Sequence, residues 1–321
     1  MNKCTIQILS GGRRQEPAVI EGVKWETSRA GEPSVFTFTC IKDEALAFSE
    51  GAKVIFSYGD TNVFHGFVFK KSRNKEHHIE VTCYDKLRYF KNKNNYVFTN
   101  VRLDQIVTRL AEDVEIPLGE ITNTRYVIPK FAAEELTLFD IINQCSAYTE
   151  IATKEIYCVY EDYDKLCLKS KEEMMLPIVI DHDTAEDFNY ATSIDDETYN
   201  QIVVKQSDSE GNSSGVTVVN STTQGQWGVL QKIVDVPEGV SPSEMARLAL
   251  ERYNQVSRSL NIVGQFGDIR VRGGSGLYVN LNLGDMIVKR KMWVEKVTHT
   301  FDNSDHYMDL TLIDWRDFRV S

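Results

Sequence analysis

The sequence predicts a mainly β fold in which two β-barrel-like domains flank an α+β insert. Three observations support this: apolar and polar residues alternate in the first 95 residues, helical spacing replaces alternation in the middle, and alternation returns after residue 190. The 321 residues exceed what one small core needs and suit two or three domains. We predict a β domain over 1–95, an α+β domain over 96–189 and a second β domain over 190–321.

The first block is predicted to consist of strands. Alternation indicates strands over 5–9, 35–41 and 79–84, and a hairpin with arms 54–58 and 63–69. Glycine-containing turns separate them. Short strands that recur roughly every 10–15 residues are typical of a closed or nearly closed barrel.

Helical spacing marks the middle block. Leu103, Ile106, Val107 and Leu110 follow an i, i+3, i+4, i+7 pattern, which predicts an amphipathic helix that ends before Pro117. The same spacing predicts a second helix within 132–149. A hairpin over 156–168 completes this α+β unit.

The last block returns to strands and contains one inserted helix. Ser241 and Glu244 form a capping box around Pro242, so the helix begins there. The polar segment 207–215 predicts a hairpin loop. Alternation predicts the strands 199–205, 216–219, 227–234, 259–266, 285–290, 292–301 and 307–313.

Charge is distributed unevenly along the chain. Residues 1–100 carry 15 Lys and Arg against 11 Asp and Glu, whereas residues 101–200 carry 8 against 22. The net charges are therefore +4 and −14, within a total of −11. An acidic middle argues against a nucleic-acid groove along the whole chain, because phosphates would be repelled there. The asymmetry either orients contacts between copies or partners, or reflects only a solvated acidic face.

The sequence also bears on the compartment. It contains no run of 18 apolar residues, and its N-terminus lacks the apolar stretch of a signal peptide, so we expect synthesis and folding in the cytoplasm. The cysteines are scattered without a CxxC pair, which predicts buried free thiols rather than a disulfide framework. They are Cys4, Cys40, Cys83, Cys145, Cys158 and Cys167.

Catalytic signatures are missing from the sequence. Residues 273–276 (GGSG) have no following Lys-Ser/Thr and predict a turn rather than a phosphate loop. No G-x-S-x-G elbow occurs, and pairs of carboxylates can be chosen anywhere in so acidic a chain. We therefore predict no enzyme activity, no cofactor, and no catalytic or cofactor-binding residues.

The histidines do not predict a metal site. His77 and His78 are expected in a strand, where neighbouring side chains point to opposite faces. We expect His65 to be a strand residue whose side chain is hydrogen-bonded. His182 lies in the acidic stretch 181–187, which could attract a hard cation, but the spacing matches no EF-hand loop. His299 and His306 flank a predicted hairpin turn and are expected at the surface.

Two basic segments allow more than one interpretation. Residues 70–75 form a predicted hairpin tip, and residues 86–93 interleave Tyr89 and Phe90 with basic side chains. Stacking combined with charge could bind nucleic acid. A solvated turn, or contact with an acidic partner, is the interpretation that we favour.

Five sequence segments, taken together, resemble those of one protein family. They are VTCYDKLRYFKNKNNYVF (81–98), YNQIVV (199–204), DIRVRGGSG (268–276), MWVEKVTHTF (292–301) and HYMDL (306–310). In this order they are similar to the baseplate hub proteins of phage tails, in particular those of XkdQ/YqbQ type from defective prophages. The resemblance covers most of the chain, except the acidic stretch near 181 and the segment 207–225.

The resemblance implies a structural role. In such hubs three copies form a ring, and each copy supplies two similar barrel domains, so that six near-equivalent barrels adapt the six-fold tail tube to a three-fold central spike. The implied partners are other copies of the chain, tail tube proteins, the spike, and LysM-type or tape-measure proteins. The implied location is the host cytoplasm during assembly and then the baseplate of a phage-like particle.

Two other classes of function stay open at this point. A tail-associated cell-wall-degrading enzyme would need a catalytic constellation that the sequence does not show. A carbohydrate- or nucleic-acid-binding module would need exposed aromatic residues on one face, for which Tyr89, Tyr96 and Trp227 are candidates.

Overall fold

The computed structural model of the chain describes residues 3–29, 31–181, 186–195, 197–207, 213–236, 240–284, 287–302 and 305–315. Its first block consists of seven described strands, in line with the predicted alternation. They are β1 (Cys4–Ser10), β2 (Arg13–Gln15), β3 (Val19–Ser28), β4 (Val35–Ile41), β5 (Lys53–Tyr58), β6 (Thr61–Arg73) and β7 (His78–Tyr84).

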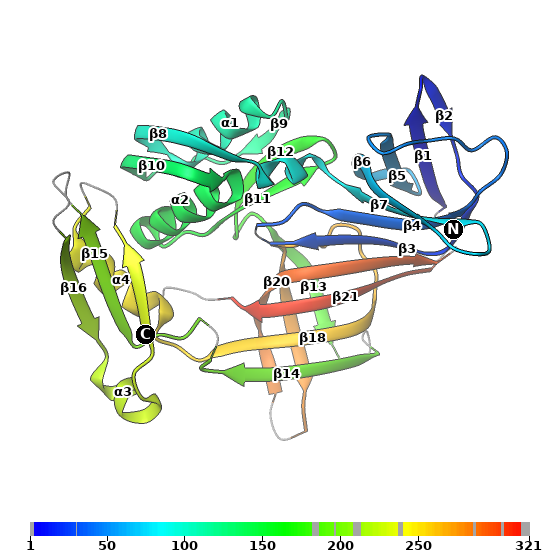
Figure 1. Ribbon diagram of the computed structural model, residues 1–321. Coiled ribbons are helices and arrows are strands. Elements are labelled where there is room, and N and C mark those ends of the chain that lie inside the picture. The colour runs from blue at the N-terminus through cyan, green and yellow to red at the C-terminus, as the bar shows by residue number, and fades with distance from the viewer. Residues whose placement is uncertain are drawn as a thin grey trace.

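The middle block packs two helices against short sheets (Figure 1). Thr137 caps the second helix, where its hydroxyl accepts a hydrogen bond from the Asp140 N–H at 3.0 Å. The elements are η1 (Lys86–Lys91), β8 (Lys93–Arg102), α1 (Leu103–Asp113), β9 (Leu118–Ile121), β10 (Val127–Thr137), α2 (Leu138–Thr153), β11 (Tyr157–Asp162) and β12 (Lys165–Ser170).

The last block again consists mainly of strands. Its framework is β13 (Met175–Asp181), β14 (Asp187–Ser193), β18 (Ser257–Phe266), β19 (Gly276–Asn282), β20 (Ile287–Asp302) and β21 (Asp305–Asp314). Between β14 and β18 the chain forms a separate small sheet with two helices. These elements are β15 (Gln201–Ser207), β16 (Ser213–Val219), α3 (Ser221–Trp227), β17 (Gln231–Asp235) and α4 (Pro242–Tyr253).

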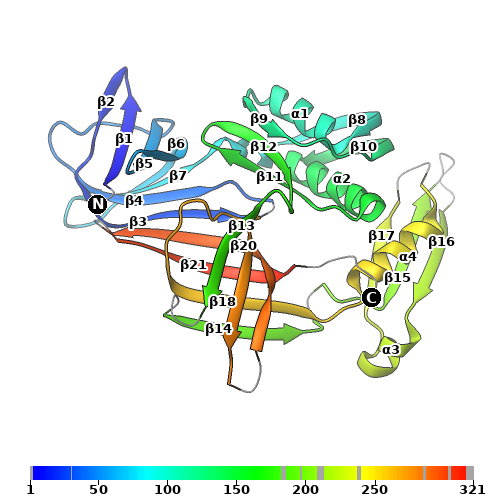
Figure 2. The same ribbon diagram turned by 180° about the vertical axis from the view of Figure 1, so that it is seen from behind.

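One sheet joins the first and last blocks. In the described part of the chain it has 13 strands in the order β14-β18-β21-β20-β3-β4-β7-β6-β5-β1-β2, with β19 and β13 added beside β20. The β3–β20 pairing connects the two blocks, and both views show β14 at the outer edge of the sheet (Figures 1 and 2).

The two blocks share one topology. The strands β3, β4, β7, β6, β5 and β1 occur in the same spatial and chain order as β14, β18, β21, β20, β19 and β13. One departure is that β13 pairs with β19 in parallel, whereas β1 pairs with β5 antiparallel. Each block therefore repeats the same arrangement around its own core.

Each β block has its own hydrophobic core. The first block buries a cluster that includes Phe36, Phe56 and Val81, and the last block buries a second cluster that includes Leu260 and Leu312. Phe301 comes from β20 of the last block but packs in the core of the first. The middle block shares its core with β15 and α4.

Some element predictions were wrong. The helix predicted within 132–149 is α2, which begins at Leu138 and extends to Thr153, but residues 127–137 before it form the strand β10, which was not predicted. The segments 285–290 and 292–301 belong to one continuous strand as far as they are described, β20. The strands β2, β3, β8, β9, β13, β14 and β19 were not predicted either. The helix α3 is a second helix in a block where one was expected, and it includes Trp227, so the strand predicted over 227–234 is confined to β17. Residues 277–282 of β19 do alternate between buried and exposed positions, so this strand was recognisable from its sequence. In β13, which contains Pro177, pairing with β19 decides the conformation.

The prediction of thiols without a disulfide framework is confirmed. None of the six cysteines, which all lie within the described residues, forms a disulfide; five are buried and Cys4 is half-buried. Burial raises the pKa of Cys145 and of Cys158 to about 12. Within the described ranges, no helix is both long enough and apolar enough to cross a bilayer.

Candidate functional site at the junction of the two β blocks

The junction between the two β blocks combines strand pairing with polar and aromatic contacts. Residues 23–28 of β3 pair antiparallel with residues 296–301 of β20. At its end, Arg29 donates from Nε to Glu295 Oε2 at 2.6 Å and lies over the Trp293 ring at 4.7 Å. Such a charge-assisted contact next to a strand ladder holds the two blocks in one orientation.

A buried stack of rings lies beneath this ladder. Trp25 and His299 stack with ring centroids 5.0 Å apart, and Phe301 stacks on His306 at 4.3 Å. His299 Nε2 lies 2.9 Å from the Val271 carbonyl, which can only accept, so this nitrogen carries the proton. His299 Nδ1 then accepts from His306 Nε2 at 2.8 Å.

The expected surface position of these two histidines was wrong. His299 is fully buried and His306 is half-buried. The alternation of β20 continues to the hairpin tip, so His299 lies on the inward face between Val297 and Phe301. The polar residues between the two histidines indicated an exposed turn, whereas the period of 2 in β20 extends past His299 to the end of the strand.

The fully buried His299 and the half-buried His306 should both make stability depend on pH. Burial lowers the pKa of His299 to about 3 and that of His306 to about 4, from an ordinary value of 6.5. Their contribution to stability is therefore fully present above pH 6.5 and is lost as the pH falls towards 4, because only the unfolded chain takes up protons there.

We expect wild type to lose stability relative to His306→Gln as the pH falls from 6.5 to 4.5, because glutamine keeps a donor for His299 Nδ1 but does not titrate. Urea unfolding of both proteins across this range would measure the difference. A difference that stays constant with pH would contradict the assignment of a neutral, half-buried His306.

A second polar cluster joins the middle block to this junction. Asp85 is buried and accepts from the Ser34 N–H at 3.0 Å and from the Leu87 N–H at 3.0 Å. Glu161 of β11 is also buried and accepts from the Lys86 N–H at 2.8 Å. Burial, and for Glu161 also the nearby Asp85, raises the pKa of both carboxyl groups.

This cluster is not accessible to a substrate. Arg272, from the loop before β19, lies over the Tyr160 ring at 4.4 Å. The cavity that it lines together with Glu161 and Ser34 has a volume of only about 20 Å³, enough for about one water molecule. The raised carboxyl pKa values therefore belong to a packed joint between three segments and not to an open catalytic pocket.

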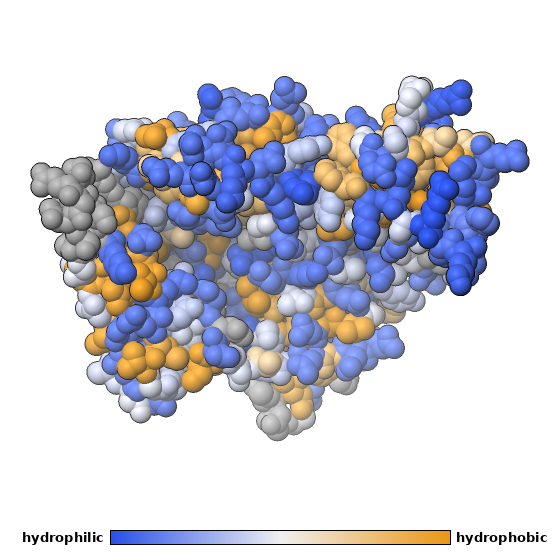
Figure 3. Space-filling model, viewed as in Figure 1, coloured by the Kyte–Doolittle hydropathy of each residue, from blue (hydrophilic) through white to orange (hydrophobic). Residues whose placement is uncertain are grey.

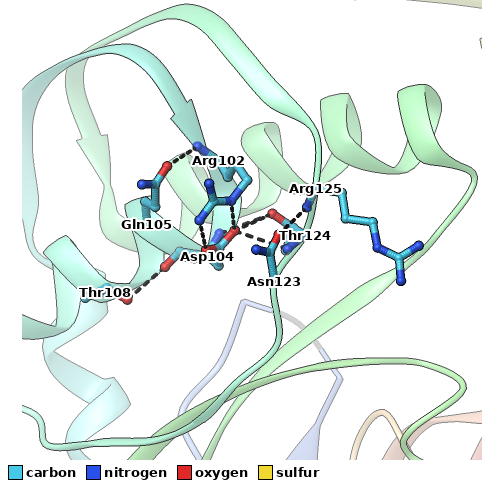
Figure 4. A network of polar contacts seen from close by, with 7 residues as sticks. All are labelled: Arg102, Asp104, Gln105, Thr108, Asn123, Thr124 and Arg125. Atoms are coloured by element: carbon cyan, nitrogen blue, oxygen red, sulfur yellow. Dashed lines mark hydrogen bonds and ion pairs between the residues drawn. The ribbon is translucent and has the colours of Figure 1, made fainter.

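The middle block contains a further network, around Asp104 at the start of α1 (Figure 4). Arg102 donates to both carboxylate oxygens of Asp104, at 3.0 and 2.9 Å. Thr124 donates to Asp104 Oδ1 from its N–H at 3.1 Å and its hydroxyl at 2.9 Å. Burial alone would raise the pKa of Asp104, but these hydrogen bonds outweigh it and lower the pKa. The network ties the helix start to the 122–126 loop.

The other predicted residues are dispersed. His65 is buried, with Nδ1 3.3 Å from Asp164 Oδ1. His77 has a positive φ of 65° and lies in the turn before β7, which begins at His78. The prediction that both histidines lie in one strand was therefore wrong. His182 and Asp183 lie outside the described residues. Among the residues that are described, no group of three His, Cys, Asp or Glu is placed to hold a metal ion.

The GGSG segment forms a turn as predicted, and it packs closely on the other block. A Cβ at Gly273 would lie 2.2 Å from the Ser28 carbonyl carbon. The Gly273 N–H donates to Thr27 Oγ1 at 2.8 Å. This contact was missed because it depends on residues 246 positions apart in the sequence.

The basic and aromatic segments form no continuous binding face. Phe90 is fully buried, so it cannot stack on a base, while Tyr89 is 37% exposed. Tyr96 is half-buried against Phe98, with centroids 5.4 Å apart, and Trp227 lies on α3 in another block. Residues 70–73 belong to β6, and the hairpin tip begins only after them, at Asn74. Figure 3 shows hydrophobic residues in several separate patches on the face in view.

The comparisons with known proteins agree with this architecture. A family model described as YQBQ-like matches residues 23–313. The chain belongs to the YQBQ-like family. Similar proteins include YqbQ of Bacillus subtilis strain 168, 29% identical over 307 residues and covering 92% of each chain. The phage-like element PBSX protein XkdQ of the same strain is 28% identical over 306 residues, which cover 93% of this chain and 92% of XkdQ.

A solved structure shares the fold. The 43 kDa tail protein of prophage MuSo2 from Shewanella oneidensis aligns with a TM-score of 0.69 at 12% identity, covering 98% of this chain and 100% of the tail protein. The resemblance to XkdQ/YqbQ-type proteins and the mainly β fold class are thus confirmed.

Proposed function

We propose that this YQBQ-like chain is the structural hub of a phage-type contractile baseplate, in which three copies form a ring between the tail tube and the central spike. The observation that carries the proposal is the repeated topology of the two β blocks. Three such chains supply six similar blocks, which suits a piece that adapts a six-fold tube to a three-fold spike. The fold shared with a prophage tail protein supports the same role.

The partners and location follow from this role. We infer contacts with other copies of the chain, tail tube proteins, the spike, and LysM-type or tape-measure proteins. The chain would assemble in the host cytoplasm and then reside in the baseplate of a phage-like particle. The predicted division into domains at 1–95, 96–189 and 190–321 is kept here as a proposal for the order of the domains, although β13 and β14 pack with the last block and begin before residue 190.

The proposed role requires no catalysis. We expect purified protein neither to clear isolated cell wall nor to bind divalent cations tightly, because the titratable clusters described above are buried in packed joints. Turbidity of a cell-wall suspension and calorimetric titration with Ca²⁺ would measure this. Clearing that disappears in Asp183→Asn or Glu186→Gln variants would contradict the structural assignment.

Ring formation should respond to salt. The first hundred residues carry a net charge of +4 and the next hundred −14, so these regions of neighbouring copies attract each other. Salt screens this attraction beyond about 8 Å at physiological ionic strength. We expect monomer and trimer to exchange in sedimentation velocity and to shift towards monomer at high salt. The tube and spike should favour the trimer by mass action. A stable two-fold dimer that is insensitive to salt would contradict the hub proposal.

A further inference from the structure

The two β blocks correspond residue by residue at their long strands. In β6–β7 the pairing register shifts between Val68 and Lys70, and in β20–β21 it shifts between Val294 and Lys296. Each bulge thus lies in a Val-x-Lys sequence. The neighbouring hydrogen bonds also match: the Val68 N–H donates to the Ala52 carbonyl at 2.9 Å, and the Val294 N–H donates to the Ser275 carbonyl at 2.8 Å.

The partner strands carry the same correspondence. Lys70 lies opposite Thr82, as Lys296 lies opposite Thr311. EVTCYD (80–85) runs from β7 to the residue directly after it, and DLTLID (309–314) ends β21. On the other side of each block, ETS (26–28) in β3 occupies the positions of ATS (191–193) in β14, because Trp25 pairs with Phe36 as Tyr190 pairs with Leu260.

Two strand edges that are paired at the junction within the chain have equivalents in the other block that no described strand pairs with. Inside the chain, residues 296–301 of β20 pair with β21 on one edge and with β3 on the other. The equivalent residues 70–73 of β6 pair with β7 on one edge, and no described strand pairs with the other. The equivalent of β3 is β14, whose only described strand partner is β18.

We propose that β14 of one copy pairs antiparallel with residues 70–73 of β6 in the next copy, repeating between chains the β3–β20 junction found within each chain. This inference rests on the proposed hub function and names its contact between copies. Transfer of the internal register places Ser193 opposite Lys70, Thr192 opposite Lys71, Ala191 opposite Ser72, and Tyr190 opposite Arg73.

The charges of the two edges also favour this pairing. Lys70 and Arg73 are exposed on β6, while residues 190–193 (YATS) of β14, which would face them, are uncharged. Like charges on facing strands destabilise a pair, so β6 favours β14 over a second β6. An exposed strand edge also presents unpaired backbone groups that another chain can complete.

The contact is head-to-tail. Since β14 and β6 are different surfaces of one chain, each copy would offer one edge to each neighbour, and the arrangement either closes into a ring or continues as a filament. Internal and intermolecular junctions would then alternate around the ring. Three copies would give six similar junctions, three within chains and three between them.

Cysteine cross-linking of the full-length protein tests the pairing. In the internal junction the pair equivalent to Ala191 and Ser72 is Glu26 and Thr298, whose side chains touch at 3.2 Å. We expect the Ser72→Cys/Ala191→Cys protein, oxidised mildly at high concentration, to form intermolecular 72–191 disulfides, identified by mass spectrometry. Five of the six native thiols are buried and should contribute little.

A matched control is Thr61→Cys/Ala191→Cys, which places the first cysteine at the exposed opposite end of β6. It should cross-link at least ten-fold more slowly. Equal rates for both pairs, or 72–72 and 191–191 bonds in place of 72–191 bonds, would overturn the proposed pairing. A trimer in sedimentation without 72–191 bonds would overturn the pairing alone, whereas a 72–191 ladder that continues beyond trimer would support the pairing and contradict the trimeric hub.

Discussion

Replacing Phe301 by alanine is expected to lower the free energy of unfolding by about 3–5 kcal/mol, the usual effect of removing a buried phenylalanine. Phe301 is 1% exposed and packs edge-on against Phe56 with centroids 4.9 Å apart. It comes from the last block but fills the core of the first, so the cavity would weaken both the core and the junction. Urea unfolding followed by tryptophan fluorescence would measure the loss.

The matched control for this variant is Phe266→Ala. Phe266 is 64% exposed on β18, so its loss should change the free energy of unfolding by no more than about 0.5 kcal/mol. Equal effects for the two variants would show that Phe301 does not connect the two cores.

A methyl group at Gly273 is expected to be costly for a different reason. In the Gly273→Ala variant the new Cβ would lie 2.2 Å from the Ser28 carbonyl carbon and 2.5 Å from the Arg29 nitrogen. Both are backbone atoms of the first block, so the loop must separate from β3, and the Gly273 N–H to Thr27 hydrogen bond should be lost with it. We expect a loss of about 3 kcal/mol, in the upper part of the range for overpacking.

Hydrogen exchange would locate this effect. Amides of β3 and of residues 296–301 should exchange faster in Gly273→Ala, because the junction opens locally. The control is Gly225→Ala, whose Cβ would meet no atom within 4 Å and should leave stability within about 0.5 kcal/mol of wild type. Unchanged protection at the junction would mean that the loop moves without disturbing β3.

Much of the architecture was predictable from local patterns. Alternation predicted β1, β4, β7 and the β5–β6 hairpin, and helical spacing predicted α1. The capping box at Ser241 marked the start of α4, where Ser241 accepts from the Glu244 N–H. These signals are local, because period and capping depend on residues a few positions apart. The family resemblance likewise rested on short contiguous segments of the sequence.

The junction could not be predicted in this way. The long separations between Gly22 and Asp302, or between Arg29 and Glu295, mean that their contacts exist only once the two blocks pair. The same holds for His299, whose burial depends on Trp25 stacking against it from a strand more than 270 positions earlier. A period-2 pattern indicates which face of a strand is apolar, but not which distant strand will cover it.

The repeat of the two blocks illustrates the same division. The Val-x-Lys and Asp/Glu-x-Thr sequences stand in the chain, but they are too short and too common to be recognised as equivalent without the strand register. The sequence alone determined that the chain is mainly β, that it contains two strand-rich blocks and that it resembles a tail hub family. Only the tertiary structure decided that the blocks share one topology and one sheet, because pairing between strands far apart in the sequence is set by the packing of the whole fold.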